Sequence, residues 1–250
     1  MNAAKELILK MADDELVIGH RNSEWTGLGP ILEEDIAFSS MAQDKVGHSL
    51  ALYTILQQQF KTPEPDQMAF HRSEKEFRCC HLVELPIGEY DFSLVRHFLF
   101  DHAEAIRYEL LSTSSFEPLA RLARKVKGEL KYHVLHANSW MTRLGHGTEE
   151  SHARIQLTLN FAMPYALGLF EESNEEVELI TENIFPGEKQ LREYWEERIR
   201  EQLEKANLSF PEVKNEAIHI GGRKGYHTEH LHPLLEEMAQ VFKLEEGVEW

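Results

Sequence analysis

Cysteine is scarce in this sequence of 250 residues: there are two, and they are adjacent at Cys79 and Cys80. Adjacent cysteines rarely bridge because the geometry is strained, so the sequence contains no disulfide framework. No stretch approaches the roughly 18 consecutive apolar residues that a membrane span needs, and the N-terminal segment MNAAKELILKMADDE lacks the apolar core of a signal peptide. These absences predict a cytoplasmic protein without a membrane partner, in which both cysteines are free packing residues.

Basic charge is also in short supply. The chain has 26 lysines and arginines against 43 aspartates and glutamates, which gives a formal net charge of −17. Such a surface repels phosphate backbones, so we expect no nucleic-acid partner. The densest basic patch, over residues 121–127, is interpreted as a solvated helix face, with a docking point for an anionic group as the alternative. Glycine-rich phosphate loops, a nucleophile elbow and a dinucleotide-binding fingerprint are absent too.

The sequence does contain apolar residues at helical spacing over most of its length, and it has almost no strand-like alternation. The spacing predicts helices over about 3–20, 30–60, 68–80, 91–113, 117–145, 149–172, 187–207 and 230–243. A short apolar run at 217–220 is either a strand or a loop. We therefore expect one all-α domain over residues 1–250, with a core helix bundle over about 3–172 and a helical extension over about 173–250.

Four of the predicted helices carry ionisable residues on their apolar faces. Lys45 and His48 interrupt the apolar stripe of the second helix, and Glu15, Asp101 and His133 interrupt those of three others. A buried lone charge is very costly, so such groups are normally paired or bound to metal. Bundle cores that receive carboxylates and histidines from four helices are typical of di-iron carboxylate proteins. The alternative for each of these residues is that the apolar stripe has been assigned one position too early or too late, in which case the side chain points to solvent.

Two further segments hold histidines at ligand-like spacing. Glu149 and His152 form a Glu-x-x-His sequence, but they follow a glycine turn at a helix start, where capping and surface contacts are the favoured interpretation. His227, His230 and His232 suggest zinc. No cysteine or second ligand pair lies nearby in the sequence, so a structural or subunit-contact role is preferred for this segment.

Seven short motifs occur in order along the chain: DELVIGHRNSEW (14–25), PILEEDIA (30–37), QDKVGH (43–48), LKYH (130–133), RLGHGTEESH (143–152), GYHTEHL (225–231) and LLEEM (234–238). Their order and spacing resemble those of the C subunits of the bacterial phenylacetyl-CoA ring-epoxidising oxygenases of phenylacetate catabolism. The resemblance covers nearly the whole chain. It implies a ferritin-like helix bundle, and a complex in which a related A subunit holds the di-iron site while the C subunit performs no chemistry.

The A subunits of that family bring a glutamate, an aspartate and two Glu-x-x-His pairs to their iron site, and the resemblance extends to four of these positions. Glu15 matches the glutamate of the first core helix, and Asp101 matches the aspartate of the third. His48 and His133 match the histidines of the second and fourth helices. The resemblance therefore implies that the cluster is a degenerate metal site.

The two remaining ligand positions depart from the A-subunit pattern. Lys45 stands where the glutamate of the second helix belongs, and Leu130 replaces that of the fourth. We expect the Lys45 ammonium to occupy the vacated metal position and to pair with Glu15 and Asp101. Glu129 is adjacent to Leu130, but neighbouring helix positions point about 100° apart and do not exchange roles without a register change.

The predicted function is that of a structural subunit without catalytic residues, metal or cofactor of its own. It would pack against the di-iron A subunit and stabilise it, and it would form a homodimer when alone. One alternative is an oxygenase or oxidase that binds one or two irons through the residual ligands Glu15, His48, Asp101 and His133. Another is a ferritin-like scaffold for a different CoA-thioester pathway.

A CoA-thioester substrate, which the resemblance implies, gives a second interpretation to the basic residues near the C-terminus. Arg223 and Lys224 lie in a short glycine-flanked segment whose simplest interpretation is a loop. Together with His227 and His230 they are candidates for contact with a CoA phosphate or with the partner subunit.

Overall fold

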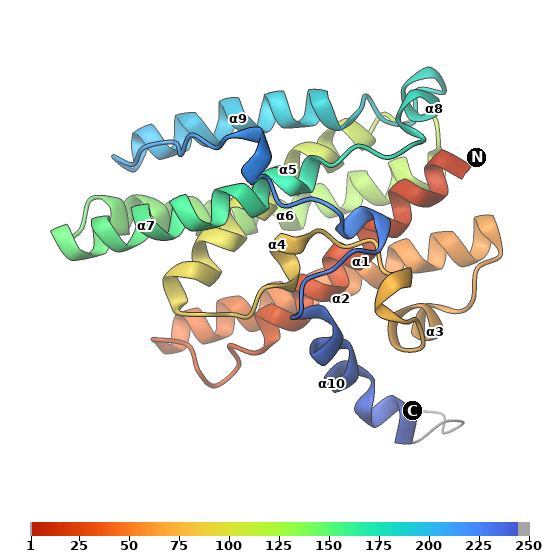
Figure 1. Cartoon of the computed structure of the whole chain (residues 1–250), viewed down its shortest axis with the longest axis horizontal. Helices are drawn as coiled ribbons and strands as arrows, with labels where there is room; N and C mark the ends of the chain where they lie inside the picture. The colour runs from red at the N-terminus through yellow and green to blue at the C-terminus, as the bar shows by residue number, and fades with distance from the viewer. Residues whose placement is uncertain (1, 245–250) are drawn as a thin grey trace.

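The computed structural model describes residues 2–244, and this part of the chain folds into ten α-helices without a β-strand (Figure 1). The helices are α1 (Asn2–Ser23), α2 (Leu32–Phe60), α3 (Pro65–Phe70), α4 (His81–Glu84), α5 (Tyr90–Leu111), α6 (Glu117–Gly145), α7 (Glu149–Ala166), α8 (Glu176–Thr181), α9 (Glu188–Lys205) and α10 (Leu231–Leu244). The expectation of an all-α, ferritin-like bundle is thus confirmed. No helix within residues 2–244 is long and apolar enough to cross a membrane.

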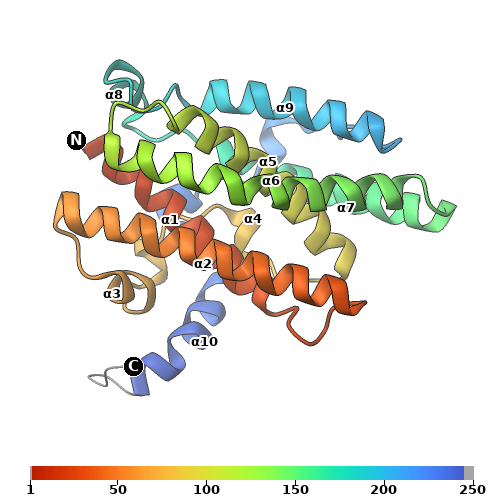
Figure 2. The ribbon, with the colours of Figure 1, turned by 180° about the vertical axis from the view of Figure 1, so that it is seen from behind.

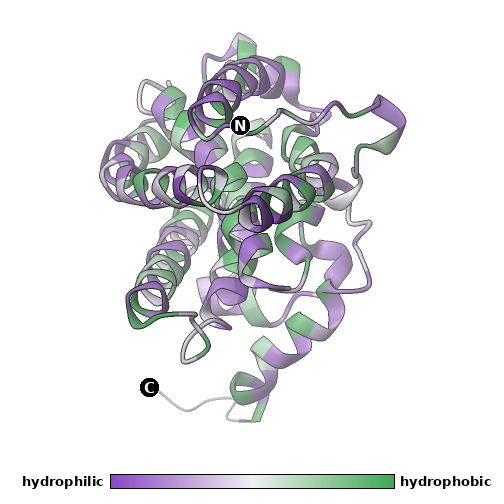
Figure 3. Cartoon of the chain, turned by 90° about the vertical axis from the view of Figure 1, so that its left-hand side faces the viewer, coloured by the Kyte–Doolittle hydropathy of each residue, from purple (hydrophilic) through white to green (hydrophobic). Residues whose placement is uncertain are grey.

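The core consists of two long helical pairs, α1 with α2 and α5 with α6. Figure 2 shows α2 and α6 side by side on one face of the molecule, with α1 and α5 behind them. Helix α1 lies inside the bundle, and every residue from Lys10 to Gly19 is buried. Helix α6 lies at the surface, and its buried residues recur every three or four positions from Ala120 to Gly145, as expected of an amphipathic helix. Seen along the bundle, the helices accordingly present both hydrophobic and hydrophilic faces (Figure 3).

Helices α7 and α9 cover α5 on the other side of the bundle. Trp195 on α9 is fully buried, and its indole N–H donates a hydrogen bond of 2.9 Å to the Leu99 carbonyl on α5. Helix α10 contacts α3 instead and projects from the bundle in Figure 1. Its Phe242 ring lies 5.1 Å from that of Phe70, centroid to centroid.

The turn between α6 and α7 shows how local chemistry sets the element boundaries. Thr148 caps α7, because its side chain accepts a hydrogen bond of 3.1 Å from the Ser151 amide. Gly145 ends α6 at a point where the chain passes very close to the end of α9. A Cβ atom on Gly145 would lie 2.0 Å from the Ala206 carbonyl oxygen, so glycine is required there.

The prediction of a single helix over 68–80 is wrong. Helix α3 ends at Phe70, a short 3₁₀ turn covers Glu74–Glu76, and the chain then runs extended to α4. The backbone amides of Arg78 and Cys80 donate to the carboxylates of Asp13 and Asp14 on α1, at 2.7 and 2.8 Å. These tertiary partners replace the hydrogen bonds that a helix would supply.

Two smaller differences, and one alternative left open by the sequence, concern the second half of the chain. Helix α7 ends at Ala166 and continues as a 3₁₀ turn over Leu167–Phe170, within the predicted range 149–172. The short helix α8 was not predicted. Of the two alternatives for the apolar run at 217–220, the structure has the loop: Ala217 ends a 3₁₀ turn that begins at Asn215, and residues 218–220 are irregular.

Candidate functional site

The five ionisable residues on the predicted apolar stripes meet in the centre of the bundle. Glu15 comes from α1, Lys45 and His48 from α2, Asp101 from α5 and His133 from α6. Their exposed fractions range from 0% to 3%, so they form a buried polar cluster without open access to solvent.

Lys45 is the cation at the middle of this buried polar cluster. Its ammonium donates a hydrogen bond to Asp101 Oδ1 and lies 3.4 Å from Glu15 Oε2. The ring of Phe100 covers it at 4.6 Å from nitrogen to ring centroid. Burial favours the neutral amine, but the negative charges of Asp101 and Glu15 outweigh burial and hold the pKa of Lys45 above its ordinary value. The lysine is therefore a charged group at neutral pH.

Asp101 is the carboxylate that connects most of the cluster. Besides Lys45, it contacts His97 Nδ1 through Oδ2, and His133 Nδ1 lies 3.7 Å from Oδ1. Burial alone would raise the pKa of Asp101. The interactions with His97, Lys45 and His133 outweigh it and hold this pKa well below its ordinary value.

The two matched histidines each join an inward carboxylate to one at the rim of the bundle. His48 Nδ1 lies 3.5 Å from Glu15 Oε2, and its Nε2 is 2.7 Å from Glu129 Oε2. Burial opposes the charged form of His48, but Glu15 and then Glu129 raise its pKa above the ordinary value.

His133 is held in the same way between Asp101 and Asp44. Its Nε2 lies 3.0 Å from Asp44 Oδ2, whose side chain is 36% exposed at the rim. The interactions with Asp101 and Asp44 outweigh burial and raise the pKa of His133. The hydrogen bond between His133 and Asp44 in turn lowers the pKa of Asp44.

Sequence reasoning missed three members of the cluster: His97, Asp44 and Glu129. His97 carried a signal, because it lies four residues before Asp101 on the same face of α5. Asp44 and Glu129 lie at the edges of their stripes and reach inward from partly exposed positions. We expected Glu129 not to take over the inward position of Leu130, and it does not. It nevertheless contacts His48 from the rim of the bundle, without any change of helix register.

A second buried network continues the cluster toward α9. Arg107 donates to Glu104 at 2.8 Å and to Glu188 at 2.5 Å, and Lys10 donates to Glu188 at 2.7 Å. Burial raises the pKa of Glu104 to about 7. For Glu188, Arg107 and Lys10 outweigh burial and lower the pKa to about 2. This network joins α1, α5 and α9 by charge as well as by apolar contact.

The donor set at the centre does not suit a di-iron centre. Leu130 is buried and offers no ligand atom, so two carboxylates, Glu15 and Asp101, remain on the inward positions. Four or more positive charges on iron require more negative ligands than these. The Lys45 ammonium lies between the two carboxylates and adds positive charge to the same space.

The basic residues near the C-terminus are not equally available for contact. Arg223 is buried and pairs with Asp14 at 2.7 Å, so it does not present its charge at the surface. The His227 side chain is 3% exposed and bonded to Glu84. Lys224 and His230 are accessible, with side chains 55% and 35% exposed, and a contact with CoA or a partner stays a prediction for these two.

The fold and this cluster define the class of protein: a ferritin-like helix bundle with a buried ion-paired centre. The family model described as phenylacetic acid catabolic protein matches residues 1–250, and the chain belongs to this family. It is 30% identical over 250 residues to the C subunit of the 1,2-phenylacetyl-CoA epoxidase of Escherichia coli (strain K12), with 100% of both chains covered. The resemblance predicted from the motifs is confirmed, and the membership supports a role in phenylacetate catabolism.

Proposed function

We propose that this chain is the structural, non-catalytic C-type subunit of a phenylacetyl-CoA epoxidase, packed against a related di-iron A subunit that it stabilises. Support comes from its membership of the family and from its similarity, over full length, to a protein named as the C subunit of that enzyme. In this proposal the chemistry on the CoA thioester takes place in the partner, and this chain contributes neither metal nor catalytic side chain.

The observation that carries the proposal is the position of Lys45 between Glu15 and Asp101. A buried carboxylate pair without a cation is strongly destabilising, and a metal normally supplies the charge in ferritin-like oxygenases. Here the ammonium supplies it, with a distance of 3.4 Å to Glu15 and a direct hydrogen bond to Asp101. The fold keeps its charge balance without iron, as a structural subunit requires.

A surface for the partner is available on α2 and α6. These helices lie side by side, yet large apolar side chains on both are at least half exposed: Leu32, Ile36, Leu50, Tyr132 and Leu135. Exposed apolar surface on paired helices is typical of an interface between subunits. We place the contact with the A subunit on this α2–α6 face, which also offers the contact for a homodimer when the partner is missing.

Iron content tests the non-catalytic role. Full-length protein is loaded anaerobically with Fe(II), desalted, and analysed for iron per chain. The expected value is near zero. Two irons per chain would overturn the proposal, and one would favour a mononuclear site at the residual ligands, with oxygen consumption as the next assay.

Co-purification with the A-type subunit of the same organism tests the α2–α6 face. The tagged chain is expected to retain the A subunit, and Leu135→Asp is expected to reduce that retention at least tenfold. Leu157 on α7 is a matched control, since it is 68% exposed and Leu135 is 65% exposed. Equal retention by Leu135→Asp and Leu157→Asp would contradict the placement of the interface, and no retention by the wild-type chain would contradict the structural role itself.

A further inference from the structure

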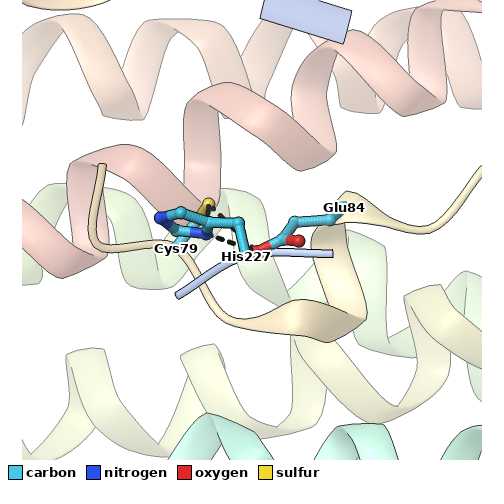
Figure 4. A group of neighbouring side chains, drawn as sticks. All are labelled: Cys79, Glu84 and His227. Atoms are coloured by element: carbon cyan, nitrogen blue, oxygen red, sulfur yellow. Dashed lines mark hydrogen bonds and ion pairs between the residues drawn. The ribbon is translucent and has the colours of Figure 1, made fainter. Parts of the chain in front are cut away.

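Outside the central cluster, Cys79, Glu84 and His227 bring three possible metal ligands together (Figure 4). His227 Nδ1 lies 2.7 Å from Glu84 Oε1 and 3.9 Å from Cys79 Sγ, and the sulfur lies 3.7 Å from Glu84 Oε1. Cys79 and Glu84 are fully buried, and the His227 side chain is 3% exposed. Spacing along the chain does not indicate this grouping, since His227 lies 148 positions after the cysteine.

The ring of His227 is oriented so that one nitrogen faces the other two residues. Its Nε2 lies 3.2 Å from the Phe77 carbonyl oxygen. A carbonyl only accepts hydrogen bonds, so Nε2 carries the proton. In the neutral ring Nδ1 then has the free lone pair, and it faces Cys79 and Glu84. Metal-bound histidines show this arrangement, with the second nitrogen donating to a backbone carbonyl.

The carboxylate of Glu84 is held in a similar way. Its Oε2 accepts hydrogen bonds of 2.7 Å from both the amide and the hydroxyl of Thr228. Arg21 donates to the backbone carbonyl of the same residue at 2.8 Å. The two bonds from Thr228 fix the carboxylate, the bond from Arg21 fixes the backbone, and Oε1 remains directed at Cys79 and His227.

The Glu84 carboxylate, whose Oε1 lies 3.7 Å from the sulfur, favours a cation beside it. Burial raises the pKa of the Cys79 thiol, and the negative charges of Glu84, Asp13 and Asp14 raise it further. A divalent ion reverses this balance, because a thiolate and a carboxylate together neutralise its two positive charges.

We propose that Cys79 Sγ, Glu84 Oε1 and His227 Nδ1 bind one zinc ion, which fastens the segment before α10 to the segment around α4. Sulfur, imidazole nitrogen and carboxylate oxygen are the usual zinc ligands, at about 2.0–2.3 Å from the metal. In a tetrahedron, such bonds place the ligands about 3.3–3.8 Å apart, close to the two distances from sulfur. His227 Nδ1 and Glu84 Oε1, now 2.7 Å apart, move apart when both bind the ion. The fourth position of the tetrahedron is left to water.

Binding releases protons, because the ligands must be deprotonated. The Cys79 thiol loses its proton to solvent when the sulfur binds the ion. No electron is transferred. The affinity for zinc is therefore expected to increase with pH.

The test uses the full-length chain, stripped with a chelator and titrated with Co(II) as the spectroscopic substitute for zinc. One equivalent is expected to give the near-ultraviolet charge-transfer band of a cobalt–thiolate bond, and zinc is expected to displace the cobalt and remove the band. A thiolate band separates this site from the central cluster, which contains no sulfur. Absence of the band in the wild-type protein would overturn the proposal, whatever happens to the variants.

Cys80 provides a matched control, since it is adjacent, 2% exposed and outside the group. Cys79→Ser is expected to lose the band and at least tenfold in zinc affinity, whereas Cys80→Ser retains both. His227→Asn is compared in the same way with His232→Asn, whose side chain is 61% exposed. Equal loss in Cys79→Ser and Cys80→Ser would contradict the assignment.

The zinc site and the non-catalytic role of the chain can be tested independently of each other. Iron loading of Cys79→Ser reports the bundle centre alone, because this variant lacks the thiolate ligand. Iron bound by the wild type but absent from Cys79→Ser belongs to the site proposed here and leaves the structural role of the chain intact.

Discussion

At the scale of single residues, Lys45 is the cation on which the charge balance of the bundle centre depends. It is fully buried and paired with Glu15 and Asp101. Lys45→Met approximately keeps the volume and removes the charge, so Glu15 and Asp101 remain buried without their lysine partner. We expect a loss of about 3–5 kcal/mol in the free energy of unfolding at neutral pH, measured by urea denaturation.

The loss should become smaller in mild acid, where a carboxylate of the variant takes up a proton instead. Lys131→Met on the exposed face of α6 is the control and should change stability by less than about 0.5 kcal/mol. A Lys45→Met variant as stable as wild type at pH 7 would show that the buried pair is not charged.

His48 predicts a pH dependence with a definite sign. Its pKa is raised in the folded state, so its contribution to stability is fully present below the ordinary pKa of about 6.5 and is lost as the pH rises through the folded value. His48→Gln should therefore cost more free energy of unfolding at about pH 6 than at about pH 8.

His102 on α5 predicts a pH dependence of the opposite sign, because its pKa is lowered in the folded state. Burial lowers its pKa to about 4, so the folded protein holds it neutral and loses stability as the pH falls below about 6.5. His102→Gln should therefore cost more at about pH 8 than at about pH 6. If both variants showed the same pH dependence, the two environments would not differ as described.

At the scale of helices, α6 contains two glycines with opposite expected responses to alanine. Gly128 is exposed and a Cβ there meets nothing within 4 Å, so Gly128→Ala should stabilise the protein by about 0.5–1 kcal/mol. At Gly145 the new Cβ would lie 2.0 Å from the Ala206 carbonyl oxygen.

Gly145→Ala is therefore expected to destabilise by about 1–3 kcal/mol in spite of the gain in helix propensity. Thermal unfolding of both variants beside wild type provides the measurement. A rise in melting temperature for Gly145→Ala would mean that the ends of α6 and α9 do not approach as closely as the structure has them.

The helices also show which parts of the fold and of the buried polar cluster could be predicted from the sequence. The long helices and their inward ionisable residues were predictable, because burial imposes a period of three to four residues on each stripe. The extended segment around Arg78 was not, because its backbone is held by Asp13 and Asp14 from a distant part of the chain. Asp44 and Glu129 were not predicted as members of the cluster either. They lie at the edges of the apolar stripes, where helical spacing does not distinguish side chains that point inward from those that point to solvent.

At the scale of the whole molecule, the proposed function predicts stabilisation by the partner. A protein that binds the folded state alone raises apparent stability by mass action. The melting temperature of this chain should therefore rise with the concentration of added A subunit. Leu157→Asp should show the same rise and Leu135→Asp should not. A melting temperature independent of the A subunit for the wild-type chain would argue against a stabilising complex.

Three successive acidic residues of α1 enter three different networks. Asp13 accepts from Arg72 and from the Arg78 amide, Asp14 binds Arg223, and Glu15 faces Lys45. Each step along a helix turns the side chain by about 100°, so all three partners are reached from a single turn. Insertion or deletion of one residue before Asp13 would rotate the three carboxylates away from their partners together. This turn of α1 therefore fixes the register of the whole helix within the bundle, because no shift along its axis keeps the three buried ion pairs together.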